Sequence, residues 1–343
     1  MSERIAVAIS GGVDSAVAAH LLKKAGHNLI ALTIASPFHI PETTLDDARR
    51  VADDLNIPLH LIDLTDGFDD LLTYLCDEYL AGRTPNPCIR CNSLLKFGSL
   101  IKAARSLDCS ALATGHYVRR QHLDARWTLL RGADLDKDQS YFLFELTHDQ
   151  IAFARFPLGD LTKTDVRRHA DELHLHVRHK PESQEICMVP DDDYPALIRR
   201  LRPDSLIPGD IIDTDGNVLG RHHGIACYTI GQRRGLGIAA PHPLYVVAID
   251  PASNRITVGP DHALYAQQLI ARNLNWIAGD PPTQPRPAHV RIRYRHTPAP
   301  ANLVPIDPET LRVTFDQPQR AVTPGQAAVF YDNDLLLGGG WIA

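Results

Sequence analysis

Apolar and polar positions follow two different periods in the first third of the chain. Short apolar runs predict strands at residues 4–9, 28–34, 58–64 and 110–114. Apolar positions spaced three to four residues apart predict helices at residues 13–24, 44–55, 68–81 and 93–107. Thr43 or Thr44 is the predicted cap of the second helix. Strands that alternate with helices in this way are typical of a doubly wound α/β fold, with a parallel sheet covered on both faces.

The ends of three predicted strands mark where a ligand would bind. Neighbouring parallel strands place their carboxyl ends at the same edge of the sheet, and ligands of such sheets bind beyond that edge. The segments after Ile9, Ile34 and Thr114 are therefore the first candidates for a functional site.

The pattern changes near residue 202. Residues 145–202 are predicted to be mainly helical, with basic and acidic side chains close together, which favours a charged and solvated surface. Beyond them, short alternating runs separated by Gly and Pro predict β structure, including a hairpin at Asp215-Gly216. We therefore predict three units: an α/β domain over residues 1–202, a small β domain over 203–266 and a closing β-barrel over 267–343.

Composition narrows the class of protein. The net charge is −6 and hydrophobic residues make up 44% of the chain, without an apolar run long enough to span a bilayer. The first residues lack the pattern of an export signal, so we expect a cytoplasmic protein that does not contact a membrane. From residue 201 onward there are 12 arginines and no lysine. This bias fits either contacts with phosphates or a genomic composition bias, and the global charge argues weakly against a nucleic-acid partner.

Two glycines and two serines follow the first predicted strand. The segment Ser10-Gly11-Gly12-Val13-Asp14-Ser15 leads directly into a helix, whose N-terminal N–H groups and dipole favour a bound anion, most plausibly phosphate. The segment lacks the lysine of a Walker A loop. A plain helix cap is the alternative for so short a stretch.

Six cysteines indicate catalysis or metal binding rather than a disulfide scaffold. Cys88 and Cys91 lie in a proline-rich segment, Thr84-Pro85-Asn86-Pro87-Cys88-Ile89-Arg90-Cys91-Asn92, followed by Lys96-Phe97. A helix that begins after Cys91, together with Arg90, would lower the thiol pKa of Cys91. Cys187 follows Glu182-Ser183-Gln184-Glu185, 96 residues beyond Cys91. The remaining three are interpreted as packing residues: Cys76, Cys109 and Cys227.

Seven motifs occur together in the order of a known family. They are SGGVDS, GRTPNPCIRCN with KF, ATGHY, KDQSYFL, ESQEICMV, YTIGQRRGLGI and VRIRYR. As a set they resemble the tRNA-specific 2-thiouridylase family of the PP-loop ATP pyrophosphatase superfamily, from Ile5 to Gly340. The resemblance implies ATP-dependent 2-thiolation of the wobble uridine of tRNA. In that reaction the C2 carbonyl oxygen of uracil is adenylated, and sulfur then displaces AMP.

The resemblance also implies roles for individual residues. The ATP phosphates are bound by Ala8, Ile9, Ser10, Gly11, Gly12, Val13, Asp14 and Ser15, and the nucleotide site is lined by Ile34 and Gly115. Cys187 carries the persulfide sulfur, and Cys91 is the partner nucleophile that can form a disulfide with it. Contacts with the tRNA or its target base are implied for Asn86, Pro87, Cys88, His116, Lys137, Asp138, Gln139, Arg293, Tyr294 and Gln326.

The implied cofactors are ATP and Mg²⁺. The implied partners are the tRNAs that accept Lys, Glu and Gln, together with a sulfur donor or relay protein. The helical segment 145–202 is expected to contact the tRNA, and the chain is expected to be a monomer. The runner-up activity is that of a PP-loop amide-forming ligase of the argininosuccinate or asparagine synthetase type, in which the reactive thiols have no role. A nucleotide- or tRNA-binding protein without activity is the non-enzymatic alternative.

Two departures from the family pattern bear on the chemistry. The best-known members carry Asp, a candidate acid or base, where this chain has Cys88, and the change creates Cys88-x-x-Cys91. With Cys187, three thiols are available to ligate a [4Fe-4S] cluster with one open iron, so the cluster and the persulfide route both stay open. The second departure is Thr33-Ile34-Ala35-Ser36, where many relatives carry Met and Trp after the second strand.

Overall fold

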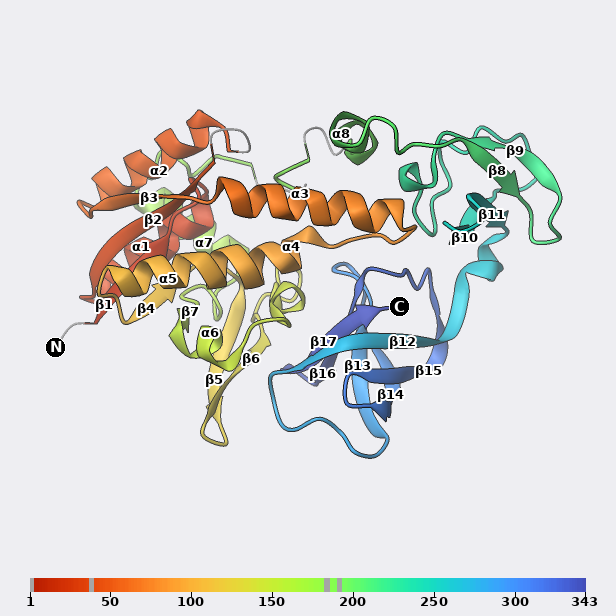
Figure 1. Ribbon diagram of the computed structural model, residues 1–343. Coiled ribbons are helices and arrows are strands. Elements are labelled where there is room, and N and C mark those ends of the chain that lie inside the picture. Colours follow the sequence, from red (N-terminus) through yellow and green to blue (C-terminus); the bar gives the residue numbers. More distant parts are fainter. Residues whose placement is uncertain (1–2, 37–39, 182–185, 190–192) are drawn as a thin grey trace.

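The computed structural model describes residues 3–36, 40–181, 186–189 and 193–343. Its N-terminal part is a parallel sheet in the order β3-β2-β1-β4-β7 (Figure 1). The strands are β1 (Arg4–Ala8), β2 (Asn28–Ala35), β3 (Leu59–Asp63), β4 (Ala111–Ala113) and β7 (Ala154–Arg155). The α/β class and the doubly wound parallel sheet are confirmed.

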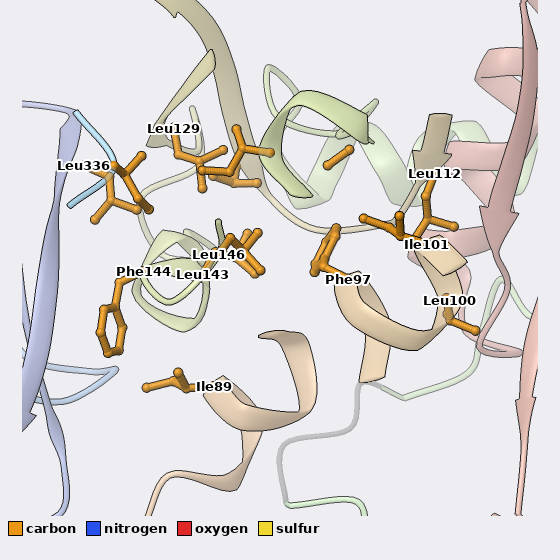
Figure 2. Packing of buried hydrophobic residues seen from close by; sticks show 14 of the residues in the cluster. Ile89, Phe97, Leu100, Ile101, Leu112, Leu129, Leu143, Phe144, Leu146 and Leu336 are labelled. Atoms are coloured by element: carbon orange, nitrogen blue, oxygen red, sulfur yellow. The ribbon is translucent and has the colours of Figure 1, made fainter. Parts of the chain in front are cut away.

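Alternation along the strands decides which helices cover which face. In β1, Ile5 and Val7 are buried in a cluster with the helices α1 (Val13–Lys24), α2 (Glu42–Asp54) and α7 (Lys163–Glu172). Ala6, between them, belongs to the cluster on the other face, together with Phe97 and Ile101 (Figure 2). Successive side chains of a strand point to opposite faces, so a continuously apolar strand is buried on both.

Three helix starts differ from the prediction, and one is that of α3 (Thr65–Leu80), which begins three residues before Phe68. Pro41 rather than Thr43 or Thr44 is the N-cap of α2, and its side chain makes no capping hydrogen bond. The helix predicted from residue 93 begins at Pro87, a favourable first helical residue because its missing N–H would be unpaired there. One continuous helical run follows: α4 (Pro87–Arg90), the π-helix η1 (Cys91–Ser99) and α5 (Leu100–Ser106). We call residues 87–99 the thiol helix.

The segment after residue 131 consists of short helices and turns. They are η2 (Ser140–Leu143), α6 (His148–Phe153) and α8 (Tyr194–Leu201), in addition to β7 and α7. Thr147 and Thr162 each accept a hydrogen bond from the third residue of the following helix, in a capping box. The long helix α3 (Thr65–Leu80) packs against the thiol helix and α8 through apolar side chains. No helix in the described ranges has the length and apolar character that a bilayer span requires.

The rest of the chain is β structure, as predicted. The middle sheet has the order β10-β11-β8-β9, from β8 (Gly209–Ile212), β9 (Val218–His222), β10 (Tyr245–Asp250) and β11 (Arg255–Gly259). The C-terminal barrel has the order β12-β15-β14-β13-β16-β17 and is closed by pairing of β12 with β17. Its strands are β12 (Tyr265–Trp276), β13 (Arg286–Arg291), β14 (Ala299–Asp307), β15 (Thr310–Arg320), β16 (Ala327–Asp332) and β17 (Leu335–Ile342).

The barrel and the N-terminal domain share a sheet and a core. The hairpin of β5 (Val118–Leu123) and β6 (Arg126–Arg131) adds to the barrel sheet, because Leu130 pairs with Leu335 of β17. The core cluster of Figure 2 also contains residues of both, such as Phe97 and Leu336. The barrel therefore bears directly on the position of the thiol helix.

Candidate functional site

The loop after β1 is organised around the hydroxyl of Ser15. Ser15 Oγ donates to the carbonyl oxygen of Gly12 at 3.0 Å, and the N–H of Ser10 donates to Ser15 Oγ at 3.2 Å. Gly11 has a φ of +66°, and a Cβ there would lie 2.7 Å from the carbonyl oxygen of Thr44. Gly12 is the extended N-cap of α1. The loop therefore presents the first N–H groups of a helix at the carboxyl edge of the sheet, which is an anion-binding arrangement.

Three strand ends meet at this loop. β1 lies between β2 and β4, so half-buried Ile34 of β2 and Gly115 after β4 flank the loop. Gly115 touches it: a Cβ there would lie 2.8 Å from the carbonyl carbon of Asp14 and from the backbone N of Ser15. The structure thus brings together the residues for which a nucleotide site was predicted.

Asp14 is held from two elements. Its Oδ1 accepts hydrogen bonds from Tyr117 Oη at 2.8 Å and from Lys163 Nζ at 2.7 Å. Lys163 is the first residue of α7, and its side chain is 13% exposed. The ammonium group therefore lies inside the loop region, close to where an anion would bind.

A second lysine also reaches the loop. Lys180 Nζ donates to the carbonyl oxygen of Gly11 at 3.0 Å and to Asp47 Oδ2 at 2.6 Å. Sequence reasoning missed Lys163 and Lys180, because the charged segment that contains them was interpreted as a solvated surface. The only signal in the sequence is the Thr162 cap, which places Lys163 at the start of a helix.

Cys91 is more deeply buried than the sequence suggested. It lies inside the helical run, one turn after Pro87, and is 6% exposed. Burial raises its pKa, and the cation of Lys96 lowers the pKa by a smaller amount. Arg90 does not act on the thiol as predicted, because its guanidinium pairs with Glu145 at 2.9 Å. The predicted lowering of the Cys91 pKa is therefore wrong, since the favourable helix N-terminus lies at Pro87.

The other two thiols of the predicted site share these surroundings. Burial raises the pKa of half-buried Cys88 to about 12, against the smaller opposing effect of Lys96. Cys187 is exposed, and its charge raises the pKa of both Cys88 and Cys91. The three sulfurs are thus electrostatically coupled. Residues 182–185 of the ESQEICMV motif lie outside the described residues. Cys76 and Cys109 are buried packing residues as predicted, and Cys227 is half-buried.

The three thiols are not grouped as metal ligands in the described part of the chain. In the part of the chain that the structure describes, no three His, Cys, Asp or Glu side chains are grouped so that they could hold a metal ion. Cys88, Cys91 and Cys187 all belong to that part. The [4Fe-4S] cluster on these three thiols stays a prediction.

The thiol helix adjoins the loop of residues 10–15, the predicted phosphate loop, through the segment that follows β4. Phe97 of the thiol helix and His116, which follows Gly115, have ring centroids 5.7 Å apart. The cation of Lys96 lowers the pKa values of Cys88, Cys91 and His116. Burial is the larger cause for His116, whose pKa lies well below its ordinary value. His116 is 8% exposed, and its ring nitrogen Nδ1 is hydrogen-bonded to Thr114 Oγ1 at 2.8 Å.

The barrel holds the segment that leads into the thiol helix. Gln326 Nε2 donates to the carbonyl oxygens of Thr84 and Pro85, at 3.0 and 3.2 Å. A Cβ on Gly325 would lie 2.9 Å from Thr84 O. The Asn86 side chain, next in the chain, is close enough to the Tyr141 hydroxyl to lower its pKa slightly, against the larger effect of burial. Gln326, predicted to contact tRNA, thus also fixes the backbone before Cys88.

The segment Lys137–Gln139 is anchored by its middle residue. Asp138 is fully buried, and its carboxylate accepts hydrogen bonds from Ser140 Oγ at 3.0 Å and from Arg291 Nη1 at 2.9 Å. Gln139 Oε1 accepts from the N–H of Tyr117 at 3.0 Å. The side chain of Asp138 therefore makes its hydrogen bonds inside the protein. Contacts of this segment with tRNA stay a prediction.

Arg293 and Tyr294 lie where the barrel meets η2. Arg293 Nη1 donates to the carbonyl oxygen of Arg320 at 3.0 Å, and burial lowers its pKa. The Tyr294 ring packs on Phe142 with centroids 4.5 Å apart. The predicted base-contact residues of the barrel therefore lie on the same side of it as the KDQSYFL segment.

Three family models match consecutive parts of the chain. They are described as a tRNA methyl transferase HUP domain over residues 3–191, a tRNA methyl transferase PRC-barrel domain over 196–260 and an aminomethyltransferase beta-barrel domain over 266–342. The chain is 48% identical to the tRNA-specific 2-thiouridylase MnmA of Geotalea uraniireducens, over 99% of this chain and 95% of that protein. It is also 48% identical to the protein of the same name from Syntrophotalea carbinolica, over 100% and 99%.

Among solved structures, a 4-thiouridine synthetase–RNA complex with bound ATP is similar to this chain with a TM-score of 0.38 and 19% identity. The match covers 59% of this chain and 51% of that one.

Proposed function

We propose a thiol-based mechanism for this chain, which belongs to the tRNA-specific 2-thiouridylase family and is an enzyme that thiolates tRNA. The uracil C2 oxygen of the wobble uridine attacks the α-phosphate of ATP, and pyrophosphate leaves. The terminal sulfur of a Cys187 persulfide then attacks C2, and AMP leaves with the former carbonyl oxygen. The Cys91 thiolate attacks Cys187 Sγ, which releases 2-thiouridine and leaves a disulfide between the two cysteines.

One observation carries the proposal: the thiol helix packs directly against the loop that touches the phosphate loop. Phe97 contacts His116, and Gly115, one residue earlier, touches Asp14 and Ser15. A base activated at the phosphate loop would therefore lie close to the thiol helix of Cys91, and the charge of Cys187, whose sulfur must attack the base, acts on that same thiol. Proximity of this kind removes most of the entropic cost of bringing two reactants together.

The nucleotide and its metal have defined places in the proposal. The loop of Ser10–Ser15 would hold the ATP phosphates through backbone N–H groups. Mg²⁺ binds mainly through substrate phosphates and one or two carboxylates, and Asp14 is the carboxylate of this loop. When bound, the ion would neutralise charge on the departing pyrophosphate. Lys163 adds a second positive charge at the same place.

We propose that the substrates are the tRNAs that accept Lys, Glu and Gln, and that a sulfur donor or relay protein loads exposed Cys187. We also propose that the enzyme is a cytoplasmic monomer. Exposure of Cys187 supports loading by another protein, because a bulky donor must reach the sulfur. The buried Cys91 is suited instead to the second step, in which it meets only Cys187.

The proposal is tested by replacing each thiol. We expect Cys91→Ser and Cys187→Ser each to lose thiolation while tRNA affinity stays within about twofold, because base recognition does not need the sulfurs. Mass spectrometry of the tRNA nucleosides measures 2-thiouridine. Cys76→Ser and Cys109→Ser are matched controls and should remain active. More than a trace of 2-thiouridine formed by either Cys91→Ser or Cys187→Ser would exclude the two-thiol mechanism.

Cys88 separates the thiol mechanism from the cluster. Under the thiol mechanism, Cys88→Asp restores the commoner family residue and is tolerated. A cluster ligated by Cys88 would instead lose a ligand, together with most of the activity. Iron and labile sulfide should be measured on protein purified without oxygen. An iron-containing brown protein whose Cys88→Asp variant is colourless and inactive would replace our proposal with the cluster.

A further inference from the structure

Glu145 joins the thiol helix to the last strand of the barrel. Its Oε1 accepts a hydrogen bond from Trp341 Nε1 at 2.8 Å and lies 2.9 Å from Arg90 Nη1. Its Oε2 accepts a hydrogen bond from Ser93 Oγ at 2.9 Å. The carboxylate is 12% exposed and therefore makes these contacts largely out of water. We call these four residues the Glu145 bridge.

Two residues of the Glu145 bridge flank Cys91 in the sequence. Arg90 precedes the cysteine and Ser93 follows it by two residues, so one carboxylate holds the helical turn on both sides of the sulfur. Ser93 is fixed once more, because its carbonyl oxygen accepts a hydrogen bond from Gln150 Nε2 at 2.9 Å. The turn that carries Cys91 is thus fixed by residues of α6, of β17 and of the turn that follows η2.

Aromatic side chains complete the arrangement. The Arg90 guanidinium lies 4.9 Å from the centroid of the Trp341 ring and 5.6 Å from that of Tyr74 on α3. The Phe144 and Trp341 rings are 5.7 Å apart. Cation–π contacts of this kind hold a guanidinium in place while its N–H groups stay directed at a carboxylate. Arg90 therefore has a single well-defined position.

We propose that Glu145 is a positioning residue for sulfur transfer, which holds Cys91 in a fixed place relative to the base-contacting face of the barrel. The inference rests on the proposed function and deepens it. Arg293, Tyr294 and Gln326 are carried by the same barrel whose last strand supplies Trp341. A target base bound by the barrel and a thiol bound to the barrel through Glu145 would keep a constant separation.

Two variants remove different parts of the bridge. Glu145→Gln keeps the size and an acceptor for Trp341 but removes the charge that holds Arg90. Trp341→Phe keeps an aromatic ring against Phe144 and Arg90 but removes the indole N–H. The matched control is Glu3→Gln, because Glu3 pairs with Arg155 at 2.7 Å in a partly buried ion pair of the N-terminal domain.

The first measurement is steady-state thiolation of tRNA with saturating ATP and excess sulfide, which attacks Cys187 Sγ of the disulfide and so restores the Cys187 persulfide and the free Cys91 thiol. Both bridge variants are expected to lower kcat about tenfold or more, while KM for tRNA changes by less than about threefold, because positioning affects the chemical step and not the binding surface. In the first turnover, pyrophosphate should be released faster than 2-thiouridine is formed, since adenylation does not need the Cys91 thiol. Glu3→Gln should keep both constants. Unchanged kcat in both bridge variants would overturn the proposal.

The second measurement needs neither tRNA nor activity. Cys91 is buried, so its alkylation by iodoacetamide reports how firmly the thiol helix is held. Peptide mass spectrometry should show faster alkylation of Cys91 in both bridge variants and an unchanged rate in Glu3→Gln. Should Glu145→Gln fail to fold, Trp341→Phe alone decides both measurements.

The two measurements separate failure of this inference from failure of the proposed function. A wild-type protein without thiolation but with bridge-dependent alkylation would contradict the proposed function and leave the bridge intact. Alkylation and kcat that are both indifferent to Glu145 and Trp341 would contradict the bridge alone.

Discussion

Gly11 and Gly12 are neighbours in the phosphate loop, but a side chain has different consequences at each. Gly11 needs its positive φ, and a Cβ there would lie 2.7 Å from a backbone oxygen. Gly12 has an extended backbone, and a Cβ would meet only Ser10 Oγ at 3.5 Å. We expect Gly11→Ala to lower the free energy of unfolding by about 1–3 kcal/mol.

Gly12→Val should instead keep the thermal midpoint and abolish ATP-dependent AMP formation, because its branches fill the space in front of the N–H groups. Thermal unfolding and AMP release measure the two effects. Normal thiolation by Gly12→Val would show that ATP binds elsewhere.

Lys163 balances the charge of Asp14 at the same loop. Removal of the ammonium leaves an unneutralised carboxylate beside the site of a polyanion, so Lys163→Met should weaken ATP binding about tenfold or more. Isothermal titration with ATP and Mg²⁺ measures the affinity. Arg168→Met is the matched control, since Arg168 lies on the same helix, is 60% exposed and pairs with Asp165. Equal affinities for the two variants would contradict the role given to Lys163.

The pKa of Cys91 makes its alkylation strongly dependent on pH. Burial raises the pKa, so the thiol is protonated at neutral pH and the reactive thiolate appears only as pH rises towards that pKa. The alkylation rate should therefore still be increasing at about pH 9. Lys96→Met removes the opposing cation and should shift the profile to higher pH, whereas Lys96→Arg should not. A profile that levels off below about pH 8 would contradict this assignment.

At the scale of elements, local patterns predicted more than long-range contacts did. The helix of α1 was predicted at its observed bounds, Val13–Lys24, because its apolar spacing ends where Gly26 takes a φ of +86°. The π-helical stretch of the thiol helix was not predicted, since it keeps the amphipathic pattern of an α-helix and shifts only the hydrogen-bond register.

In the candidate site, too, local patterns were predictive and long-range contacts were not. The phosphate loop was placed correctly beside Gly115, because strand order and a glycine-rich turn are local signals. Glu145 and Trp341 are 196 residues apart in the sequence, and neither belongs to a motif that predicts their contact. Burial of Cys91, which reversed the predicted direction of its pKa shift, likewise depends on packing by distant elements.

The loop of the barrel at Gly325 controls the entry to the thiol helix. Gly325 has a φ of +86°, and a Cβ would lie 2.9 Å from Arg83 Cβ and Thr84 O. Gly325→Ala should therefore displace the segment before Cys88 and lower thiolation with unchanged ATP affinity. Gly216→Ala is the matched control, because Gly216 has a φ of +89° with nothing within 4 Å of its Cβ. If both variants lose activity to the same extent, the loss is caused by backbone strain at the glycine and not by displacement of the segment before Cys88.

At the scale of the whole molecule, the N-terminal and C-terminal parts of the chain differ in charge. The chain carries a net charge of −6, yet its 12 arginines beyond residue 200 include several exposed ones on the middle sheet and barrel. Arg233 and Arg234 lie in an exposed loop between β9 and β10 of the middle domain. The sheet of that domain lies at the opposite end of the molecule from α2 (Figure 1). We therefore expect this end to meet the phosphates of tRNA, despite the acidic total.

Salt dependence measures such contacts directly. Each duplex phosphate that an arginine neutralises releases counterions, so log K should fall with log salt by about 0.9 per contact. A variant with both Arg233→Ala and Arg234→Ala should bind tRNA more weakly and show a slope that is smaller by about one to two. Arg49→Ala on α2, where Arg49 pairs with Glu42 and Asp46, should leave affinity and slope unchanged. An unchanged slope in the double variant, measured by filter binding across a salt series, would place the tRNA on another face of the protein.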